Sequence, residues 1–310
     1  MHEKNYRNVF IGTSTFDSLT KKKITLLRNN GIIIKLNPKK RKLSKKELTK
    51  FAKDSEIIIA GTEIYDKEVL LKLNKLKFLF RLGSGDENID HLILKTKKVK
   101  YRKSKITPFK AVAELIVGMI LILYRNIINH HNHLIKKKWE KNMGNLLFGK
   151  TIGIIGFGKV GKYLSHLIKN FGVKVLIYDP LKITRNQSRL TYVLKKSDII
   201  SLCASYNGGP PILNKKNLNL IRRNSILINT SRPEHLDHNH LIKLLKNNKI
   251  AGVGLDVFEK EPYDGDFVKE KNIILTPHVG SYALEIRKEM ENEALQTILK
   301  YLNGNKKYNI

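Results

Sequence analysis

The sequence predicts an α/β protein made of two domains, each with a doubly wound parallel sheet. Three observations lead to this prediction. Short apolar runs rich in β-branched residues alternate with helix-length intervals. These runs form two series, separated by a long helical segment. Runs such as 225–229 have a continuous apolar centre, as strands buried on both faces do. The length of 310 residues also fits two domains of roughly 100 to 200 residues each.

The expected elements follow in chain order. The first series has strands at residues 9–11, 32–36, 57–60 and 78–82 and ends near residue 104. A helix is expected over 108–133. The second series has strands at 152–155, 174–178, 199–203, 226–229, 252–256 and 273–275. The lysine-rich stretch 39–53 is typical of a solvated helix face.

Composition narrows the possible classes of protein. Lys and Arg number 59 against 27 Asp and Glu, a net charge of +32 that favours anionic partners. A hydrophobic content of 41% excludes general disorder. The single cysteine, Cys203, excludes an internal disulfide and a Cys-based zinc site, which favours a reducing cytoplasm. Residues 1–12 lack an apolar stretch of signal-peptide length, and the most apolar segment, 115–124, is too short for a membrane span.

The strongest local signal is an apolar strand that runs into G-x-G-x-x-G and then into a helix. Gly156 permits the tight turn, Gly158 lets the backbone approach a pyrophosphate, and Gly161 lets the helix pack close to the strand. The N–H groups at the helix start, near Lys159 and Val160, would face the phosphates. The pattern predicts a dinucleotide-binding Rossmann domain; the alternative is a glycine turn with no nucleotide.

A second strand of this domain ends in Asp179, 18 residues beyond Gly161 and near the expected interval of roughly 20. A carboxylate there accepts hydrogen bonds from ribose hydroxyls and repels a 2′-phosphate. We therefore predict NAD rather than NADP, although Lys182 and Arg185 follow closely and keep the second possibility open.

Three segments that follow later strands carry reactive side chains: Arg232 after the fourth strand of the second series, Glu261 after the fifth and His278 after the sixth. Because ligands bind outside the carboxyl ends of parallel strands, these residues could meet in one site. An arginine can hold a carboxylate, and a histidine can exchange a hydroxyl proton near neutral pH. A glutamate beside the histidine would orient the ring and stabilise its protonated form.

Together with the glycine loop, these three segments make the sequence resemble the NAD-dependent D-2-hydroxyacid dehydrogenase family, and the resemblance covers nearly the whole chain. The resemblance also includes Arg81-Leu-Gly83-Ser84-Gly85-Asp-Glu-Asn88-Ile-Asp90 and Ala111-Val-Ala-Glu114-Leu. The phrase Ala60-Gly-Thr-Glu63 and the absence of an added regulatory domain look most like short phosphoglycerate-dehydrogenase-like members.

The resemblance implies an NAD-binding Rossmann domain over residues 105–281 and a flavodoxin-like substrate domain over 1–104 and 282–310. It implies that Arg232 binds the substrate carboxylate, that His278 is the acid/base and that Glu261 is its partner. N–H groups of Ser84 and Gly85 would clamp the carboxylate. The cofactor contacts implied in addition to the glycine loop are Ala204, Thr230, Asp256 for the carboxamide, and Gly280.

The implied reaction is hydride transfer between NAD and a small anionic 2-hydroxy or 2-keto acid. The sequence favours phosphoglycerate dehydrogenase, which interconverts 3-phosphoglycerate and 3-phosphohydroxypyruvate in serine biosynthesis. Arg125 and either Arg81 or Arg102 are candidate phosphate contacts, while an ordinary helix-end cation is the alternative for Arg125. A glyoxylate or hydroxypyruvate reductase is the alternative enzyme. The family also implies a homodimer formed through the nucleotide domains.

Several positions depart from the family pattern. Pro233 follows the catalytic arginine in place of the usual glycine and should push Arg232 towards extended backbone angles. Cys203 and Ser205 replace a common His and Pro, and residues 208–211 replace a polar loop. The pocket near the adenosine is therefore expected to differ, while the three catalytic identities are retained.

The excess charge has three interpretations: a lysine-rich coat, an electropositive site for a phosphorylated substrate, or a dehydrogenase-like module that senses NAD as a corepressor or binds nucleic acid. Aromatic residues do not alternate with the basic runs, which disfavours single-strand binding. Two histidine groups have possible metal-ligand spacing, but both lie in polar stretches, and no metal is expected. They are His130, His131 and His133, and His235, His238 and His240.

Overall fold

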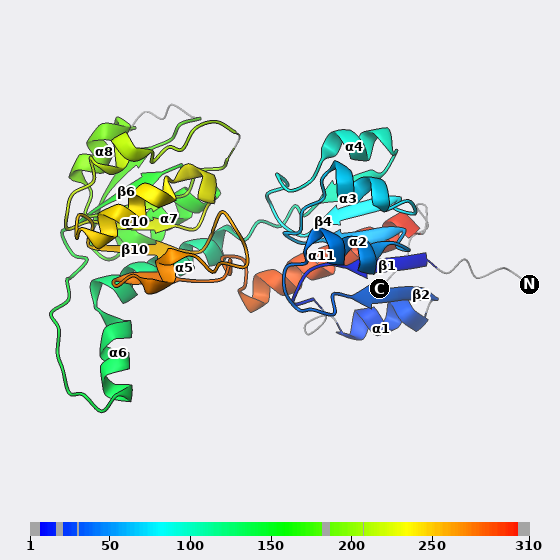
Figure 1. The fold of residues 1–310 in the computed structure, drawn as a ribbon, viewed down its shortest axis with the longest axis horizontal. Coiled ribbons are helices and arrows are strands. Elements are labelled where there is room, and N and C mark those ends of the chain that lie inside the picture. Colours follow the sequence, from blue (N-terminus) through cyan, green and yellow to red (C-terminus); the bar gives the residue numbers. More distant parts are fainter. Residues whose placement is uncertain (1–6, 17–20, 30, 182–186, 207, 303–310) are drawn as a thin grey trace, which may run out of the picture. The chain divides into compact units, whose positions relative to one another are not determined.

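The computed structural model describes residues 7–16, 21–29, 31–181, 187–206 and 208–302 (Figure 1). It divides into two units, Met1–Pro108 with Tyr282–Ile310, and Phe109–Ser281. Unit 1 has a five-stranded sheet of order β2-β1-β3-β4-β5, and unit 2 has a six-stranded sheet of order β11-β10-β9-β8-β6-β7. All neighbouring strands pair in parallel. The predicted fold class of two doubly wound α/β domains is confirmed.

In unit 1 the strands are β1 (Arg7–Ile11), β2 (Ile32–Leu36), β3 (Ile57–Ala60), β4 (Phe78–Arg81) and β5 (Lys100–Lys103). The helices are α1 (Lys21–Asn29), α2 (Lys45–Ala52), α3 (Lys67–Lys72), α4 (His91–Thr96) and α11 (Leu284–Leu302). Apolar residues of α2, α3 and α4 fill one side of the sheet, while α1 and α11 cover the other.

Helix α11 comes from the far end of the chain, and Figure 1 shows it in orange to red among the blue and cyan elements of unit 1. Its buried residues Met290, Leu295 and Ile298 pack with Ile57 and Phe80 of the sheet. Unit 1 is therefore complete only when both ends of the chain contribute.

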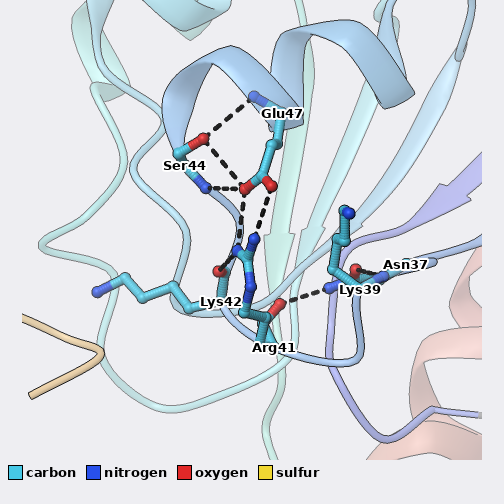
Figure 2. Close-up of polar contacts among 6 residues, drawn as sticks. All are labelled: Asn37, Lys39, Arg41, Lys42, Ser44 and Glu47. Atoms are coloured by element: carbon cyan, nitrogen blue, oxygen red, sulfur yellow. Dashed lines mark hydrogen bonds and ion pairs between the residues drawn. The ribbon is translucent and has the colours of Figure 1, made fainter.

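Helix α2 begins with a capping box, which explains why this lysine-rich segment is helical. The Ser44 side chain accepts a hydrogen bond from the Glu47 N–H, and the Glu47 carboxylate accepts one from the Ser44 N–H (Figure 2). Arg41 donates to both oxygens of Glu47, at 2.9 and 2.7 Å. The loop before the helix is tied by Asn37, whose amide donates to the carbonyl oxygen of Gly12.

In unit 2 the strands are β6 (Thr151–Ile155), β7 (Lys174–Tyr178), β8 (Ile199–Leu202), β9 (Ile226–Asn229), β10 (Gly252–Leu255) and β11 (Ile273–Leu275). The α-helices are α5 (Phe109–Tyr124), α6 (Ile127–Ile135), α7 (Lys159–Lys169), α8 (Leu190–Lys196), α9 (Lys215–Leu218) and α10 (His238–Lys246). Two 3₁₀ turns are η1 (Pro233–His235) and η2 (Asp266–Lys269). Helices α5 and α7 cover one side of the sheet, and α8, α9 and α10 the other. Strand order reverses around β6, the place where open α/β sheets bind ligands.

Two elements differ from the sequence prediction. The helix expected over 108–133 is two helices, α5 and α6, bent by 62° at a break where Asn126 takes left-handed angles (φ 53°). The carbonyl oxygen of Tyr124 there accepts a hydrogen bond from the Asn145 N–H instead of continuing the helical ladder. Strand β5, missed by the prediction, is an edge strand of sequence Lys-Tyr-Arg-Lys with little apolar character.

Within the described ranges no single helix has both the length and the hydropathy of a membrane span. Helices α5 and α6 reach these limits only when they are taken together across their bend.

Candidate active site

The glycine loop follows β6 and needs its glycines. Gly156 has a φ of +97°, and a Cβ there would lie 2.4 Å from the main chain of Ala204. A Cβ on Gly161 would lie 2.2 Å from the carbonyl oxygen of Gly156. Gly158 is different, since a Cβ there would meet only open space. The first two glycines serve the packing of the protein itself, whereas the space beside Gly158 is available to a ligand that approaches the backbone.

Gly158 is the N-cap of α7, and no side chain caps this helix. The N–H groups of the first turn, which includes Lys159, Val160 and Gly161, therefore lack a side-chain acceptor at the N-cap. Such a helix start attracts an anionic group through its N–H donors and its dipole. The loop and the helix start together fit a pyrophosphate.

Asp179 stands at the end of β7, as predicted, and is 8% exposed. Its Oδ2 accepts a hydrogen bond of 2.7 Å from the Phe157 N–H, and its Oδ1 accepts one of 2.9 Å from the Leu181 N–H. A carboxylate oxygen can in general accept more than one hydrogen bond, which is compatible with ribose hydroxyls as donors to Asp179. Lys182 and Arg185 lie outside the described residues.

Thr230 and Ala204 follow β9 and β8 at the same carboxyl edge. The Thr230 side chain is buried, and its Oγ1 has no hydrogen-bond partner among the described residues. Such a group is costly to leave unpaired, which fits a polar ligand beside it. The Ala204 carbonyl oxygen lies 3.2 Å from His235 Nε2, and burial lowers the pKa of this histidine. His235 thus anchors the loop where the family's usual His and Pro are replaced.

Asp256 organises the segment that carries the candidate acid/base. It is 1% exposed, and burial raises its pKa. Its Oδ1 accepts hydrogen bonds from Thr276 Oγ1 and the Val279 N–H, at 2.6 and 2.8 Å, and its Oδ2 accepts one from the Gly280 N–H at 2.9 Å. Sequence reasoning missed this structural role of Asp256, because it depends on how the loop after β11 turns back over β10.

His278 and Glu261 meet through this arrangement. His278 Nδ1 lies 3.0 Å from Glu261 Oε1, with side-chain exposures of 36% and 16%. The His278 backbone has a φ of 56°, and its N–H donates to the Thr276 carbonyl oxygen. No hydrogen bond within the described chain uses Nε2 of His278, so this nitrogen can exchange a proton with a substrate while Glu261 orients the ring.

Arg232 follows β9, the strand next to β10. The Asn229 side chain shapes its turn, with Oδ1 accepting from the Ser231 N–H and Nδ2 donating to the Arg232 carbonyl oxygen. Arg232 is extended, with φ −141° and ψ 141°, as expected before Pro233, which begins the turn η1. Its Nη1 donates to the Ser231 carbonyl oxygen at 2.8 Å. The proline is thus accommodated as the first residue of a 3₁₀ turn.

The predicted substrate residues of unit 1 lie in the loop after β4. Ser84 is exposed and Gly85 is half-buried. The candidate phosphate contacts are scattered. Arg81 is buried and donates to the carbonyl oxygen of Leu82, whereas Arg102 is exposed on the edge strand β5.

Arg125 lies at the edge of the unit 2 sheet where β10 starts, opposite the edge that carries Gly280. Helix α5 begins near Gly280, which Val112 approaches, and ends beside Gly252 at the start of β10. The edge where α5 ends has a cavity of about 450 Å³ lined by Tyr124, Asp198 and Arg222. None of the predicted site residues lines this cavity.

In the described ranges no group of three or more His, Cys, Asp or Glu side chains has the arrangement of a metal site. The predicted histidine groups instead contain residues with protein partners. His238 Nε2 lies 3.1 Å from the carbonyl oxygen of Pro233, and His240 Nε2 lies 2.8 Å from Asn219 Oδ1.

Residues 117–280 match the model of the family described as "D-isomer specific 2-hydroxyacid dehydrogenase, NAD binding domain". The chain is 33% identical to a glyoxylate reductase of Thermococcus litoralis over 275 residues, 83% of each chain. It is 30% identical to a D-3-phosphoglycerate dehydrogenase of Methanocaldococcus jannaschii over 276 residues, which are 84% of this chain and 52% of that one. The fold is similar to the crystal structure of the TT0316 protein from Thermus thermophilus, with a TM-score of 0.84, 24% identity, and 97% and 99% of the two chains covered.

Proposed function

Because the chain belongs to the D-isomer specific 2-hydroxyacid dehydrogenases, we propose that it reduces a small unphosphorylated 2-keto acid, glyoxylate or hydroxypyruvate. The predictions of the family, of an oxidoreductase acting on CH–OH groups and of a nicotinamide dinucleotide cofactor are confirmed. The choice of substrate depends on the arginines. Arg81 is buried beside its own loop, and Arg125 lies at the opposite edge of the unit 2 sheet, and both placements support a substrate without a phosphate group.

We assign the cofactor to the glycine loop, the start of α7, Asp179 and Thr230. Asp179 favours NAD over NADP, because a carboxylate repels a 2′-phosphate. When bound, the cofactor supplies the hydride that adds to C2 of the keto acid. The cofactor contacts of Ala204, Asp256 and Gly280 stay predictions of the same assignment.

The chain's own residues handle the carboxylate and the proton. Arg232 binds the substrate carboxylate and steadies the negative charge that develops on the C2 oxygen. His278 delivers a proton from Nε2 to that oxygen, and Glu261 stabilises the protonated ring through Nδ1. The N–H groups of Ser84 and Gly85 hold the carboxylate. In the reverse direction, His278 takes the proton.

The test compares kcat/KM for glyoxylate, hydroxypyruvate and 3-phosphohydroxypyruvate, each with NADH and with NADPH. We expect turnover of the first two with NADH and at least about a tenfold preference for hydroxypyruvate over its 3-phosphate. The opposite preference would establish the phosphoglycerate dehydrogenase that the sequence favoured. No turnover, together with salt-sensitive DNA binding, would favour the corepressor or nucleic-acid alternative.

We also propose a homodimer formed through an apolar arm, residues 127–148 of unit 2. The arm exposes large apolar side chains: Ile127, Ile128, Leu134, Ile135, Trp139, Met143, Leu146 and Phe148. Contiguous exposed apolar surface marks an interface, and Figure 1 shows α6 standing off from the rest of its unit. Light scattering should give a dimer for the wild type and a monomer for Ile135→Glu with Trp139→Glu. We place the protein in the cytoplasm, since its one cysteine is free.

A further inference from the structure

In the loop between β4 and α4, Ser84 is exposed and Gly85 is half-buried. Apart from this loop's own turns, no described residue accepts a main-chain hydrogen bond from the N–H of Ser84 or Gly85. Under the proposed function these donors bind the substrate carboxylate, so their direction decides the affinity for the keto acid. A segment with glycines on both sides of Ser84 has many accessible backbone conformations and needs support.

Arg81, the last residue of β4, supports the start of this loop through its side chain. Its Nη1 donates to the carbonyl oxygen of Leu82 at 2.6 Å. The guanidinium also lies against Gly83, where a Cβ would come within 2.6 Å of the same Nη1. Gly83 has a φ of +155°, which favours glycine for a second reason. The arginine side chain and the glycine are therefore matched, since any side chain at residue 83 would displace the guanidinium.

Arg81 is 8% exposed, and a buried guanidinium needs a counter-charge. Glu63, 2% exposed, lies in the loop after β3, the strand that pairs with β4. Its Oε2 accepts a hydrogen bond of 2.9 Å from the Gly61 N–H. Burial raises the pKa of Glu63, and the charge of Arg81 opposes this by favouring the carboxylate. A charged residue is thus kept inside the unit at the place where the loop starts.

The side chains of Asn88 and Asp86 hold the second half of the loop. Asn88 Nδ2 donates to the carbonyl oxygens of Gly61 and Glu63. Asp86 Oδ2 accepts a hydrogen bond of 2.9 Å from Tyr101 OH. In the first half, which leads to Ser84 and Gly85, the Leu82 N–H donates to the Ala60 carbonyl oxygen and the Gly83 N–H to that of Arg81. The Arg81 side chain adds a side-chain donor there, at the Leu82 carbonyl oxygen.

We propose that Arg81 is a positioning residue for the substrate carboxylate: its guanidinium fixes the main chain at Leu82 and Gly83 and so directs the N–H groups of Ser84 and Gly85. This inference rests on the proposed function, because it assigns Arg81 to the carboxylate end of a 2-keto acid. Arg81 then acts through the main chain and makes no contact with substrate itself.

Arg81→Met removes the donor and the charge but keeps an unbranched side chain. We expect KM for glyoxylate and hydroxypyruvate to rise about tenfold, the factor for loss of one charge-assisted hydrogen bond. The value of kcat should change less than about threefold, and Kd for NADH, measured by fluorescence, should stay the same. A merely destabilised protein would instead lose active fraction, with a lower kcat at unchanged KM. Arg81→Lys, which keeps the charge and one donor, should recover part of the loss.

Arg28→Met is the matched control, because the Arg28 guanidinium also donates to a main-chain carbonyl of unit 1, that of Ile34 at 3.3 Å, but not at this loop. Its KM should equal that of the wild type. Gly83→Ala adds a coupling test. In the wild-type background the new Cβ displaces the guanidinium, whereas in Arg81→Met that clash is gone. The KM increase caused by Gly83→Ala should therefore be at least about threefold smaller in the Arg81→Met background.

Unchanged KM in Arg81→Met, or KM effects that multiply independently in the double variant, would overturn the inference. If Arg81→Met loses its far-UV circular dichroism, Arg81→Lys and Gly83→Ala decide by the same KM criterion. Turnover by the wild type distinguishes a failure of the proposed function from a failure of the inference about Arg81. A wild type that turns over no 2-keto acid overturns the proposed function and this inference together, whereas an active wild type with unchanged KM in the variants overturns only the inference.

Discussion

The carboxyl edges of the two sheets differ in which residues are buried and which are exposed. At the edge of unit 2 a partly exposed histidine is held by carboxylates behind it, since Glu261 contacts His278 and the buried Asp256 fixes the loop around it. At the edge of unit 1 the arrangement is reversed, because the charged Arg81 is buried and the loop residue Ser84, proposed to bind through its main chain, is exposed. A group that exchanges protons must be presented to the substrate, whereas a group that shapes a backbone works best from inside.

The largest expected effect on activity comes from replacing His278, the partly exposed side chain of unit 2. His278→Asn should lower kcat/KM by about 10²- to 10⁴-fold, because it removes the group that exchanges the proton. The Kd for NADH should stay close to that of the wild type. Glu261→Gln removes the negative partner at 3.0 Å and should cost less, about 10- to 100-fold. His240→Asn, on a surface helix of the same unit, is the control. Full activity in His278→Asn would refute the acid/base assignment.

A smaller effect on activity is expected for Asp256, which holds the loop that carries His278. Asp256→Asn replaces an acceptor of three hydrogen bonds by a group with one accepting oxygen, which leaves a buried donor unpaired. We expect a destabilisation of about 1–3 kcal/mol in urea unfolding and a lower kcat from a displaced His278. Asp264→Asn, 74% exposed in the neighbouring segment, should leave both unchanged. Equal stability of Asp256→Asn and the wild type would show that the carboxylate does not hold this loop.

The smallest effect sharpens the comparison within unit 1, where Arg41 and Glu47 form an exposed pair (Figure 2). The hydrogen bond from Arg41 and that from the Ser44 N–H lower the pKa of Glu47 from 4.5 to about 2. A carboxylate with a lowered folded pKa stabilises the fold above its unfolded pKa and loses this effect as pH falls towards 2. Glu47→Gln should lower Tm by about 2 °C or less at pH 6.

That Tm difference should shrink as the pH falls below 4.5, the ordinary value for this carboxyl group. Melting curves of both proteins at pH 6, 4.5 and 3.5 measure it. Asp264→Asn, in an exposed pair with Lys260, is the control. A rise in KM for the keto acid in Glu47→Gln would mean that exposed pairs at this edge also shape the site, and the contrast with Arg81 would not hold.

The sequence was sufficient for features that a short stretch of chain determines. Apolar runs located the buried strands, and the glycine spacing located the turn after β6, because each depends on neighbouring residues. Strand β5 was missed since an edge strand needs no apolar face. The break at Asn126 is accompanied by a hydrogen bond from the Asn145 N–H to the Tyr124 carbonyl oxygen, which joins residues distant in the chain. The contact of Glu261 with His278 agrees with their expected partnership, while their roles stay predictions. The support that Arg81 gives the loop was not predictable, since it requires knowing where the guanidinium lies.

The position of helix α11 in the chain affects how the protein folds during its synthesis. During translation the strands of unit 1 leave the ribosome before unit 2, yet Met290, Leu295 and Ile298, which cover one side of that sheet, leave after the whole of unit 2. Unit 2 is contiguous from Phe109 to Ser281 and can fold in between. Unit 1 therefore starts to be synthesised before unit 2 but can be completed only after it. Until α11 has been synthesised, one face of the unit 1 sheet stays uncovered and can associate with other apolar surfaces.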